Sequence, residues 1–499
     1  MKNIMKNLEL QNHKNLHQKT IKIFGPPGTG KTHTLIERVL KKHLAKGIHP
    51  KDIAFISFTN KAVDTARDRA LATFTQYTTD DFQRFRTLHK YCRRYFEEEV
   101  FDPKNCMLDY ALQAKIIKTS DNRLSDDNFH YKDWSLGIYD KARNTLQEPQ
   151  LVYKKESYKK DSLDVFLRKI DTYKNYKKDS FIDFNVKKIY LAGDDDQGIY
   201  KWNGADPKYF TTYFPGRKVI LRQTRRFGEE IYKFSQIIRK GIFDSVEKDY
   251  DYVAKKGSVN RYLNFKEVPF HKLEGTWYIL GRIHSTVNEL RMAAKTVGLY
   301  FSDNKGNKSF DIKQWEAIKA WTTLSNNKKI TRNSAENMYK YIRELEDFNF
   351  RTPKFWQTIP DTQMFNLKDL REWAGLSMDD SYLQKNWWEV LKRNFKDNQV
   401  SYFVQLLKNY GQKILSKSPN IIIDTIHSVK GGEANNVLIY SKTNYASSFD
   451  KKNREEKSDE KRVYYTAVTR ARDTLHILST DFHFNYPIGK DYLIYLQES

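Results

Sequence analysis

The sequence predicts an α/β protein, and three observations support this prediction. A glycine-rich stretch, residues 25–32, stands between a short apolar run and a segment with helical spacing. Comparable apolar runs, each the length of a single strand, alternate with helical segments over much of the chain. Two longer stretches, 90–179 and 283–420, interrupt this alternation and are mostly helical in pattern. We therefore expect an alternating α/β core with two helical insertions.

The glycine-rich stretch has the pattern Gly-x-x-x-x-Gly-Lys-Thr, and its flanks are those that such a loop requires. Residues 20–24 are predicted to form the short buried strand that enters it. The helix that leaves it is predicted from five apolar residues on one face, Leu35, Ile36, Val39, Leu40 and Leu44. Gly47 and Pro50 are expected to end that helix.

This loop has the chemistry of a phosphate site. Glycines allow successive backbone N–H groups to turn inward around a phosphate chain, and the following helix directs its positive dipole end at the same phosphates. Lys31 can reach the terminal phosphates, and the hydroxyl of Thr32 can ligate Mg²⁺. The alternative is a glycine-rich turn with an unrelated lysine, which the flanking strand and helix disfavour. We therefore expect ATP to be bound by Gly25, Pro26, Pro27, Gly28, Thr29, Gly30, Lys31 and Thr32.

The composition indicates several domains and a polyanionic partner. A chain of 499 residues exceeds the size of one ordinary core, so we expect two to four domains. An apolar fraction of 39% argues against a disordered chain. The chain carries 87 Lys and Arg against 62 Asp and Glu, which is a net charge of +25. This excess favours nucleic acid as a partner, although a basic, solubilising surface would have the same composition.

The cysteines and the N-terminal residues are typical of an intracellular protein. Cys92 and Cys106 have no metal-ligand spacing and form no disulfide framework, which suits a reducing compartment. Residues 1–20 lack an apolar signal core, and no apolar run reaches the roughly 18 residues of a membrane span. We expect a cytoplasmic protein with no membrane partner. The abundance of Lys, Asn, Tyr and Phe resembles AT-rich coding bias and indicates a virus or phage as the source.

Further apolar runs predict seven more strands. They lie at 53–58, 187–192, 218–221, 277–282, 421–424, 437–440 and 475–478. The charged segment 447–460 is predicted to be a loop. Arg470 is expected on a helix with small neighbours, where a fixed guanidinium could face phosphate.

Two polar clusters that follow apolar runs suit a phosphate backbone. Thr59 and Asn60 follow the strand at 53–58, at the point where a helix is expected to begin. Thr87 and His89 lie in a second cluster of the same kind. Each cluster by itself is weak, because Thr and Asn also cap ordinary helices.

Two aromatic residues follow the strand at 187–192. Tyr200 and Trp202 are two positions apart, so their side chains face the same way if the chain is extended. Exposed aromatic rings of this kind form stacking platforms for single-stranded bases. The alternative is a pair of core aromatics, which the polar neighbours disfavour.

Taken together, six stretches resemble the motifs of superfamily 1A DNA helicases of the UvrD/PcrA/Rep type. In chain order they read GPPGTGKT, ISFTNKAVDTA, FRTLH, GDDDQGIYKWNGAD, TIHSVKGGE and VYYTAVTRAR. The resemblance spans nearly the whole chain and implies two RecA-like P-loop motor domains with parallel sheets, each carrying a helical insertion. It implies ATP between the two domains. The first motor domain would comprise 1–89 and 180–222, with its insertion at 90–179. The second would comprise 223–282 and 421–499, with its insertion at 283–420.

The resemblance also implies roles for individual residues in catalysis. Lys31 and Thr32 would hold the β- and γ-phosphates and Mg²⁺, and Gln197 would sense the γ-phosphate and couple it to DNA. Arg226 and Arg470 would reach the γ-phosphate from the second motor domain and stabilise transition-state charge.

The remaining implied roles concern the ribose and the DNA. Glu433 would bind the ribose of the nucleotide. Bases would stack on Phe58, Tyr200 and Trp202. The DNA backbone would lie near Thr59, Asn60, Thr87, His89 and His427.

One departure from the family pattern concerns hydrolysis. The family places a strand ending in Asp-Glu before the GDDDQ stretch; its Asp holds Mg²⁺ through water, and its Glu positions and deprotonates the attacking water. Here Asp183 and Phe184 run directly into 185–187 and the next strand, and the single Asp-Glu dipeptide of the chain is at 459–460. The sequence thus lacks this general base and a central strand of the first motor domain. A natural deletion, a split or spliced gene, and an edited sequence all remain open as explanations.

These observations predict an ATP-dependent DNA helicase or translocase that moves 3′ to 5′ on single-stranded DNA and unwinds duplex, in repair, replication or recombination. The alternative is a nucleotide-dependent DNA-binding protein with little or no hydrolysis, because the Asp-Glu pair is missing. Asp194, Asp195 or Asp196 could replace the Mg²⁺ ligand, but they match a different motif. A remnant with a destabilised first domain is a third interpretation. The expected cofactors are ATP and Mg²⁺. The expected partners are single-stranded and duplex DNA and repair or replication proteins, with the chain acting as a monomer or weak dimer.

Overall fold

The computed structural model describes residues 19–57, 60–87, 138, 148–155, 162–168, 187–200, 207–213, 215–342, 353–374, 379–391, 395–411, 414, 418–444, 448–479 and 486–498. Contacts divide the chain into two compact units. The first unit comprises 1–257, 451–472 and 498–499, and the second comprises 258–450 and 473–497. The boundaries predicted for the two motor domains and their insertions stay predictions.

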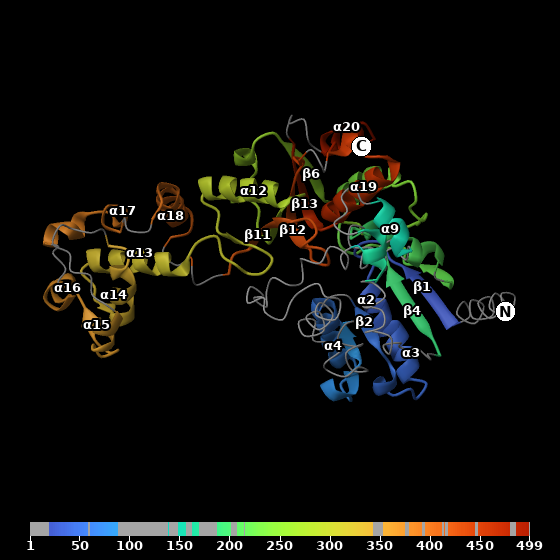
Figure 1. Cartoon of the computed structure of the whole chain (residues 1–499), viewed down its shortest axis with the longest axis horizontal. Coiled ribbons are helices and arrows are strands. Elements are labelled where there is room, and N and C mark those ends of the chain that lie inside the picture. The colour runs from blue at the N-terminus through green and yellow to red at the C-terminus, as the bar shows by residue number, and fades with distance from the viewer. Residues whose placement is uncertain are drawn as a thin grey trace. The chain divides into compact units, whose positions relative to one another are not determined.

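The first unit contains a three-stranded parallel sheet in the order β4-β1-β5 (Figure 1). The middle strand, β1 (Thr20–Phe24), pairs with β4 (Ile189–Gly193) on one side and with β5 (Arg217–Ile220) on the other. Ile23 and Phe24 are buried, which suits a central strand. The strand predicted at 20–24 is confirmed, and those at 187–192 and 218–221 are confirmed with small shifts at their ends. Since the strands are parallel, the segments that follow β1 and β4 leave the same edge of the sheet.

A second parallel sheet of this unit pairs β2 (Phe55–Ser57) with β3 (Phe85–Thr87). Within the described residues it is separate from the three-stranded sheet. Phe55 stacks on Phe85 with ring centroids 5.3 Å apart. α4 (Asn60–Thr73) packs on both strands and begins at Asn60, where the sequence predicts a helix. The strand predicted at 53–58 is therefore confirmed for 55–57.

The helix that follows β1 is continuous from residue 31 to residue 44 but changes its winding. It consists of α2 (Lys31–His33), the π-helix η1 (Thr34–Leu40) and α3 (Lys41–Leu44). Ile36 and Leu40 are the buried members of the predicted apolar face. They pack with apolar residues of α4, so this face ties the helix after the loop to the two-stranded sheet.

Among the described residues, the first unit has three other α-helices: α9 (Pro149–Lys155), α11 (Glu229–Lys240) and α19 (Arg454–Val468). α11 packs against α19. The loop predicted at 447–460 is wrong from residue 454 onward, because Asn453 and Glu456 form a reciprocal capping box that starts α19 within the charged segment. Arg470 is likewise not on a helix: α19 ends at Val468, and Arg470 lies in the turn that leads into β13 (Ala471–Leu478).

The second unit contains a six-stranded sheet in the order β6-β13-β12-β7-β11-β8. Its other strands are β6 (Ser258–Tyr262), β7 (Trp277–Gly281), β8 (Phe301–Ser302), β11 (Ile421–Thr425) and β12 (Ala434–Tyr440). The pairs β6–β13, β12–β7, β7–β11 and β11–β8 are parallel. All residues of β7 are buried, as expected of a strand with neighbours on both sides. The strands predicted at 277–282, 421–424, 437–440 and 475–478 are confirmed, whereas β6 and β8 were not predicted.

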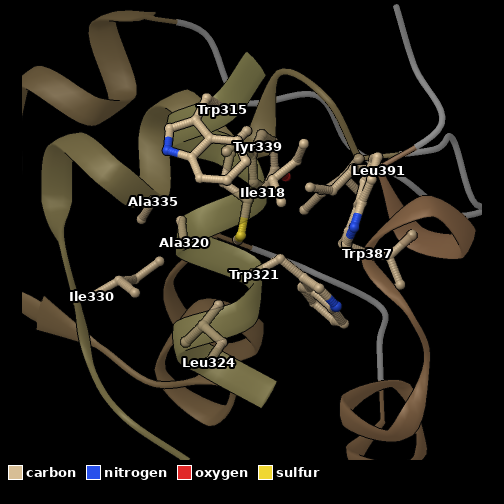
Figure 2. Packing of buried hydrophobic residues seen from close by; sticks show 14 of the residues in the cluster. Trp315, Ile318, Ala320, Trp321, Leu324, Ile330, Ala335, Tyr339, Trp387 and Leu391 are labelled. Atoms are coloured by element: carbon tan, nitrogen blue, oxygen red, sulfur yellow. The ribbon is translucent and has the colours of Figure 1, made fainter. Parts of the chain in front are cut away.

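Most helices of the second unit lie between β8 and β11. They are α13 (Ile312–Ser325), α14 (Arg332–Tyr339), α15 (Pro353–Gln357), α16 (Leu367–Ala374), α17 (Trp387–Val390) and α18 (Asp397–Tyr410). A short hairpin pairs β9 (Ile330–Thr331) with β10 (Met364–Phe365). Figure 2 shows Trp315 and Trp321 of α13 and Trp387 of α17 in the core that these helices share. The expectation that Trp387 belongs to a core is thereby confirmed.

The remaining elements complete the description. α12 (His284–Thr296) packs on β7 and β11, and α20 (Ile488–Glu498) ends the chain. The described 3₁₀ helices are η2 (Pro50–Asp52), η3 (Thr79–Phe82), η5 (Asp195–Gln197), η8 (Phe265–Glu267), η9 (Asp380–Gln384) and η12 (Phe449–Lys451), and η7 (Tyr209–Tyr213) is a π-helix. Among the described residues, a helix with the length and apolar character needed to cross a membrane is not found. The α/β class with parallel strand pairing is the fold class that the sequence predicts.

Candidate nucleotide-binding site

The glycine-rich loop leaves β1 and turns into α2, as its pattern predicts. The N–H of Gly25 donates to the carbonyl of Gly193 at 2.9 Å, so the loop starts beside the end of β4. Gly28 and Gly30 have φ values of 76° and 79°, which side chains with a Cβ rarely adopt. Gly30 is the residue from which the helix begins, and Lys31 is its first residue. The backbone thus has the turn that an inward-facing phosphate cradle requires.

Lys31 folds back over its own loop. Its ammonium group donates to the carbonyl of Gly25 and, at 3.3 Å, to that of Pro26. Burial is the main cause that lowers the pKa of Lys31 to about 8. Asp194 opposes this shift, whereas Arg226 and Arg470 add to it. A cationic group crowded by two other cations has more to gain from an anion than an isolated lysine does.

The segment that carries Arg226 lies directly against the loop. The N–H of Arg225 donates to the carbonyl of Gly28 at 2.9 Å. A Cβ on Gly28 would come within 2.5 Å of both the Cβ of Arg226 and the Oγ1 of Thr224. The Nη1 of Arg226 donates to the carbonyl of Thr469 at 2.9 Å. Gly28 is therefore required both by its φ and by the close approach of this segment.

Gln197 and Arg470 are in direct contact. The Nη2 of Arg470 donates to the Oε1 of Gln197 at 2.6 Å, and its Nε donates to the carbonyl of Thr466 at 3.0 Å. The Nε2 of Gln197 donates to the Oδ2 of Asp194 at 2.5 Å. Both side chains of the Arg470–Gln197 pair are largely buried. The structure thus brings together Lys31, Gln197, Arg226 and Arg470, which the sequence assigned to one site.

Three consecutive carboxylates precede Gln197 and surround one lysine. The Nζ of Lys248 lies 3.2 Å from Asp194 and 2.6 Å from both Asp195 and Asp196. Arg239 adds a second cation, since its Nε donates to Asp196 at 2.9 Å. The ammonium group therefore takes the place in which these carboxylates would hold a metal ion.

The pKa shifts of this cluster follow from its burial and its charges. Burial opposes ionisation of Asp194, but Lys248 and Lys31 outweigh it, so the pKa of Asp194 lies below its ordinary value. Burial and the neighbouring Asp196 raise the pKa of Asp195. Burial opposes the charge of Lys248, yet the three carboxylates raise its pKa above the ordinary value. The lysine is therefore charged at neutral pH.

The loop residues fit a triphosphate with Mg²⁺. The left-handed glycines give the loop its turn, and the charges of Arg226 and Arg470 both act on Lys31, so three cations lie near the loop. Thr32 is half-buried in the first turn of α2, next to Lys31. Residues 25–32 would hold the phosphates, and the Thr32 hydroxyl would be the Mg²⁺ ligand.

Two predicted DNA contacts line one cavity of the first unit. The cavity has a volume of about 270 Å³ and lies between α4 and β3. Asn60 and Thr87 contribute to its wall, together with the side chains of Arg67 and Arg86. Thr87 is nearly buried and Asn60 is exposed, so the two differ in access to a ligand.

The other predicted ligand residues are distributed as follows. Tyr200 is half-buried, and burial raises the pKa of its hydroxyl. His427 and Glu433 belong to the second unit, where His427 lies in the turn after β11 and Glu433 is exposed just before β12. Their roles stay predictions. Four predicted residues lie outside the described part of the chain, namely Phe58, Thr59, His89 and Trp202.

Sequence reasoning missed four residues that build the site. Lys248 and Arg239 balance the acidic turn, Thr224 lies against Gly28, and Arg462 donates to the carbonyl of Asp195 at 3.0 Å. Arg462 immediately precedes the VYYTAVTRAR stretch, which was a usable signal. The other three lie outside the matched motifs, and nothing in their local sequence marks them.

Comparison with known proteins adds independent information. Residues 6–186 match the family described as UvrD/REP helicase N-terminal domain. A "Probable DNA helicase II homolog" of Mycoplasma pneumoniae is 21% identical in an alignment that covers 92% of this chain and 81% of that protein. The "ATP-dependent DNA helicase PcrA" of Bacillus subtilis is 24% identical, over 60% of this chain and 50% of that protein.

A third relative extends this comparison. The "ATP-dependent DNA helicase Rep" of Buchnera aphidicola is 22% identical, over 82% of this chain and 72% of that protein. The chain thus spans most of two relatives and half of the third. The family match includes the glycine-rich loop and ends just before β4.

Proposed function

We propose that this chain is an ATP-driven DNA motor of the UvrD-like superfamily 1A type, because residues 6–186 match the UvrD/REP helicase N-terminal domain family and the relatives are named as DNA helicases. One observation carries the proposal: Gln197, Arg226 and Arg470 lie together with the loop 25–32 in one compact unit. Such a set can bind a triphosphate and respond to its γ-phosphate. ATP with Mg²⁺ would supply the free energy for movement.

Each residue has a proposed task in that motor. Lys31 would hold the β- and γ-phosphates, since its buried ammonium already lies over the loop. Arg226 and Arg470 would stabilise charge on the γ-phosphate. Gln197, which bonds to Arg470, would report the state of the nucleotide to bound DNA. Glu433 would bind the ribose.

Single-stranded DNA is the proposed track. The net charge of +25 favours a polyanion, and Asn60 and Thr87 line a cavity whose wall carries two arginines and two aspartates. We propose backbone contacts at these two residues and at Thr59, His89 and His427, and base stacking on Phe58, Tyr200 and Trp202. We also propose that the chain moves 3′ to 5′ and unwinds duplex DNA. It would do so inside a cell, as a monomer or weak dimer, and with partner proteins in repair, replication or recombination. A phage origin stays a prediction from composition.

A second candidate function is nucleotide-dependent DNA binding with little or no hydrolysis. Two observations favour it. The chain has no Asp-Glu pair before β4, and within the described residues β4 is an edge strand while β2 and β3 form a sheet of their own. In addition, Asp194, Asp195 and Asp196 are occupied by Lys248. Loss of a general base and a metal contact would lower turnover by several orders of magnitude.

One experiment separates these functions. Phosphate release from ATP is measured on the full chain with and without an oligo(dT), beside the variant Lys31→Ala. A motor shows multiple turnovers that the oligonucleotide stimulates and that the variant lacks. The second candidate shows nucleotide-dependent binding of the oligonucleotide without turnover. Absence of both nucleotide and DNA binding by folded protein contradicts both functions. For an active chain, duplexes with a 3′ or a 5′ single-stranded tail test the direction.

A further inference from the structure

A lysine outside all six motifs holds the acidic turn that carries Gln197. The side chains of Lys248, Asp195 and Asp196 have 0% exposure, and that of Asp194 has 2%. The ammonium group lies within ion-pair distance of all three carboxylates and donates a hydrogen bond of 2.6 Å to Asp196. Because water does not reach these groups, Lys248 acts on the turn and not directly on a ligand.

The three carboxylates depend on this lysine for their charge balance. Adjacent buried carboxylates repel one another strongly unless cations compensate them. Two cations pair with them directly, Lys248 with all three and Arg239 with Asp196. The backbone supports the turn as well, since the N–H of Val246 donates to Asp195 at 2.8 Å. Without Lys248 the cluster would hold three acids against one directly paired cation.

A chain of contacts leads from Lys248 to Arg470. One oxygen of Asp194 faces Lys248 at 3.2 Å, and the other accepts from the amide nitrogen of Gln197 at 2.5 Å. This bond orients the amide so that its oxygen faces Arg470, which donates to it at 2.6 Å. If Asp194 loses its place, the amide loses the partner that sets its orientation.

We propose that Lys248 is a positioning residue for the coupling between nucleotide and DNA: by holding Asp194, it keeps the Gln197 amide oxygen directed at Arg470. This inference rests on the proposed function, because the coupling exists only if both ligands bind. Lys248 would contact neither the nucleotide nor the DNA. Its removal therefore weakens the response of one ligand to the other more than it weakens either binding reaction.

The test uses the full chain and three variants. Lys248→Met keeps the length of the side chain without its charge, Lys248→Arg keeps the charge, and Lys256→Met removes an exposed lysine eight positions along the chain as a matched control. Fluorescence anisotropy gives the Kd of a labelled oligo(dT) with and without a non-hydrolysable ATP analogue and Mg²⁺. A fluorescent ATP analogue gives the nucleotide Kd without DNA. Neither readout requires hydrolysis.

The expected result is a split between binding and coupling. In Lys248→Met, the nucleotide Kd stays within about threefold of the parent, while the analogue-induced change in the oligo(dT) Kd is lost. Lys248→Arg restores most of that change, and Lys256→Met behaves as the parent. If Lys248→Met responds to the analogue as the parent does, the inference is wrong. If the parent binds neither ligand, the proposed function fails and the inference with it.

A second variant covers the case in which Lys248→Met does not fold. Lys248→Met with Asp195→Asn removes one acid together with the cation, and Asp195 does not contact Gln197 in the described network. This double variant restores the charge balance but leaves Asp194 without its lysine. It is expected to fold and still to lack the analogue-induced change. Normal coupling in the double variant would overturn the inference.

Discussion

The guanidinium group of Arg470 donates a hydrogen bond of 2.6 Å to the side-chain oxygen of Gln197, across 273 positions of sequence. Both residues are nearly buried, Arg470 at 2% exposure and Gln197 at 9%. The contact joins the turn after α19 to the acidic turn after β4. In the proposed motor, this contact would transmit the state of a nucleotide at the loop to both segments.

Replacement of Arg470 by Met is expected to destabilise the first unit. The change leaves the Oε1 of Gln197 without its Arg470 donor, and a buried polar group that loses its partner costs about 1 to 3 kcal/mol. Urea denaturation measures the effect. The control is Arg472→Met, two positions along at an exposed site, which should change stability by less than about 0.5 kcal/mol. Equal effects of the two changes would contradict the role of the Arg470–Gln197 contact.

Replacement of Lys31 by Met is expected to separate stability from ligand binding. Burial and the nearby Arg226 and Arg470 disfavour the charge of Lys31 in the free protein, so its removal should leave the melting temperature unchanged or raise it. The rise in melting temperature that an ATP analogue causes should disappear, because the anion loses its principal cation. Differential scanning fluorimetry measures both quantities. The exposed Lys41→Met is the control, and an analogue-induced rise that survives in Lys31→Met would contradict the site.

Gly28→Ala and Gly47→Ala form a matched pair. Both glycines have a positive φ, 76° and 78°, so the backbone strain of a Cβ, about 1 to 2 kcal/mol, is common to both. At Gly28 the Cβ would also collide with Arg226 and Thr224, whereas at Gly47 no atom lies within 4 Å. We expect Gly28→Ala alone to lose binding of the ATP analogue by at least about tenfold, about 1.4 kcal/mol. Isothermal titration calorimetry measures this, and equal losses in the two variants would show that strain alone matters.

The affinity for single-stranded DNA is expected to fall steeply with salt. Each phosphate contact contributes a slope of about −0.7 to the plot of log affinity against log salt for a single strand. Arg86 lines the cavity with Asn60 and Thr87. Arg86→Gln should therefore make the slope shallower by about 0.7, the contribution of one phosphate contact. The exposed Arg38→Gln serves as control. Anisotropy titrations at four salt concentrations measure the slopes, and an unchanged slope in Arg86→Gln would remove this cavity from the DNA path.

Acid is expected to destabilise the second unit through His476. Burial lowers the pKa of His476 to about 4, from 6.5. In the unfolded chain the group takes up a proton at a higher pH than in the folded one, so its contribution is fully favourable above pH 6.5 and is lost as the pH falls toward 4. The loss amounts to about 3 kcal/mol by pH 4.

The variant His476→Gln tests this pH dependence. The side chain of His476 stacks on Trp277 and contacts the hydroxyl of Tyr262 at 3.3 Å, and Gln can replace the latter contact without titrating. The unfolding free energy of the variant should fall less between pH 6.5 and pH 4 than that of the parent. The exposed His284→Gln should keep the pH dependence of the parent. Parallel curves for the parent and His476→Gln would contradict the assignment.

The phosphate loop was predictable because the residues that shape it are adjacent in the sequence. The loop 25–32 carries its own turn residues, its own cation and the start of its own helix, so pattern and structure agree there. The apolar runs predicted β1, β7 and β11 for a similar reason, since burial on both faces requires continuous apolar sequence. β6, with the sequence Ser-Val-Asn-Arg-Tyr, has one buried residue and escaped this signal. The start of α19 was missed because the capping box of Asn453 lies in a segment whose charge resembles a loop.

The amino-acid sequence alone predicted the loop 25–32 with the strand and the helix that flank it, and its resemblance to helicase motifs singled out Lys31, Gln197, Arg226 and Arg470. The tertiary structure was needed to find the partner of the acidic turn. Lys248 is 52 positions away from Asp196, and no spacing rule connects them. The physical reason is that a buried charge is balanced by whichever cation the fold brings within hydrogen-bond reach, and that choice depends on packing and not on neighbouring sequence.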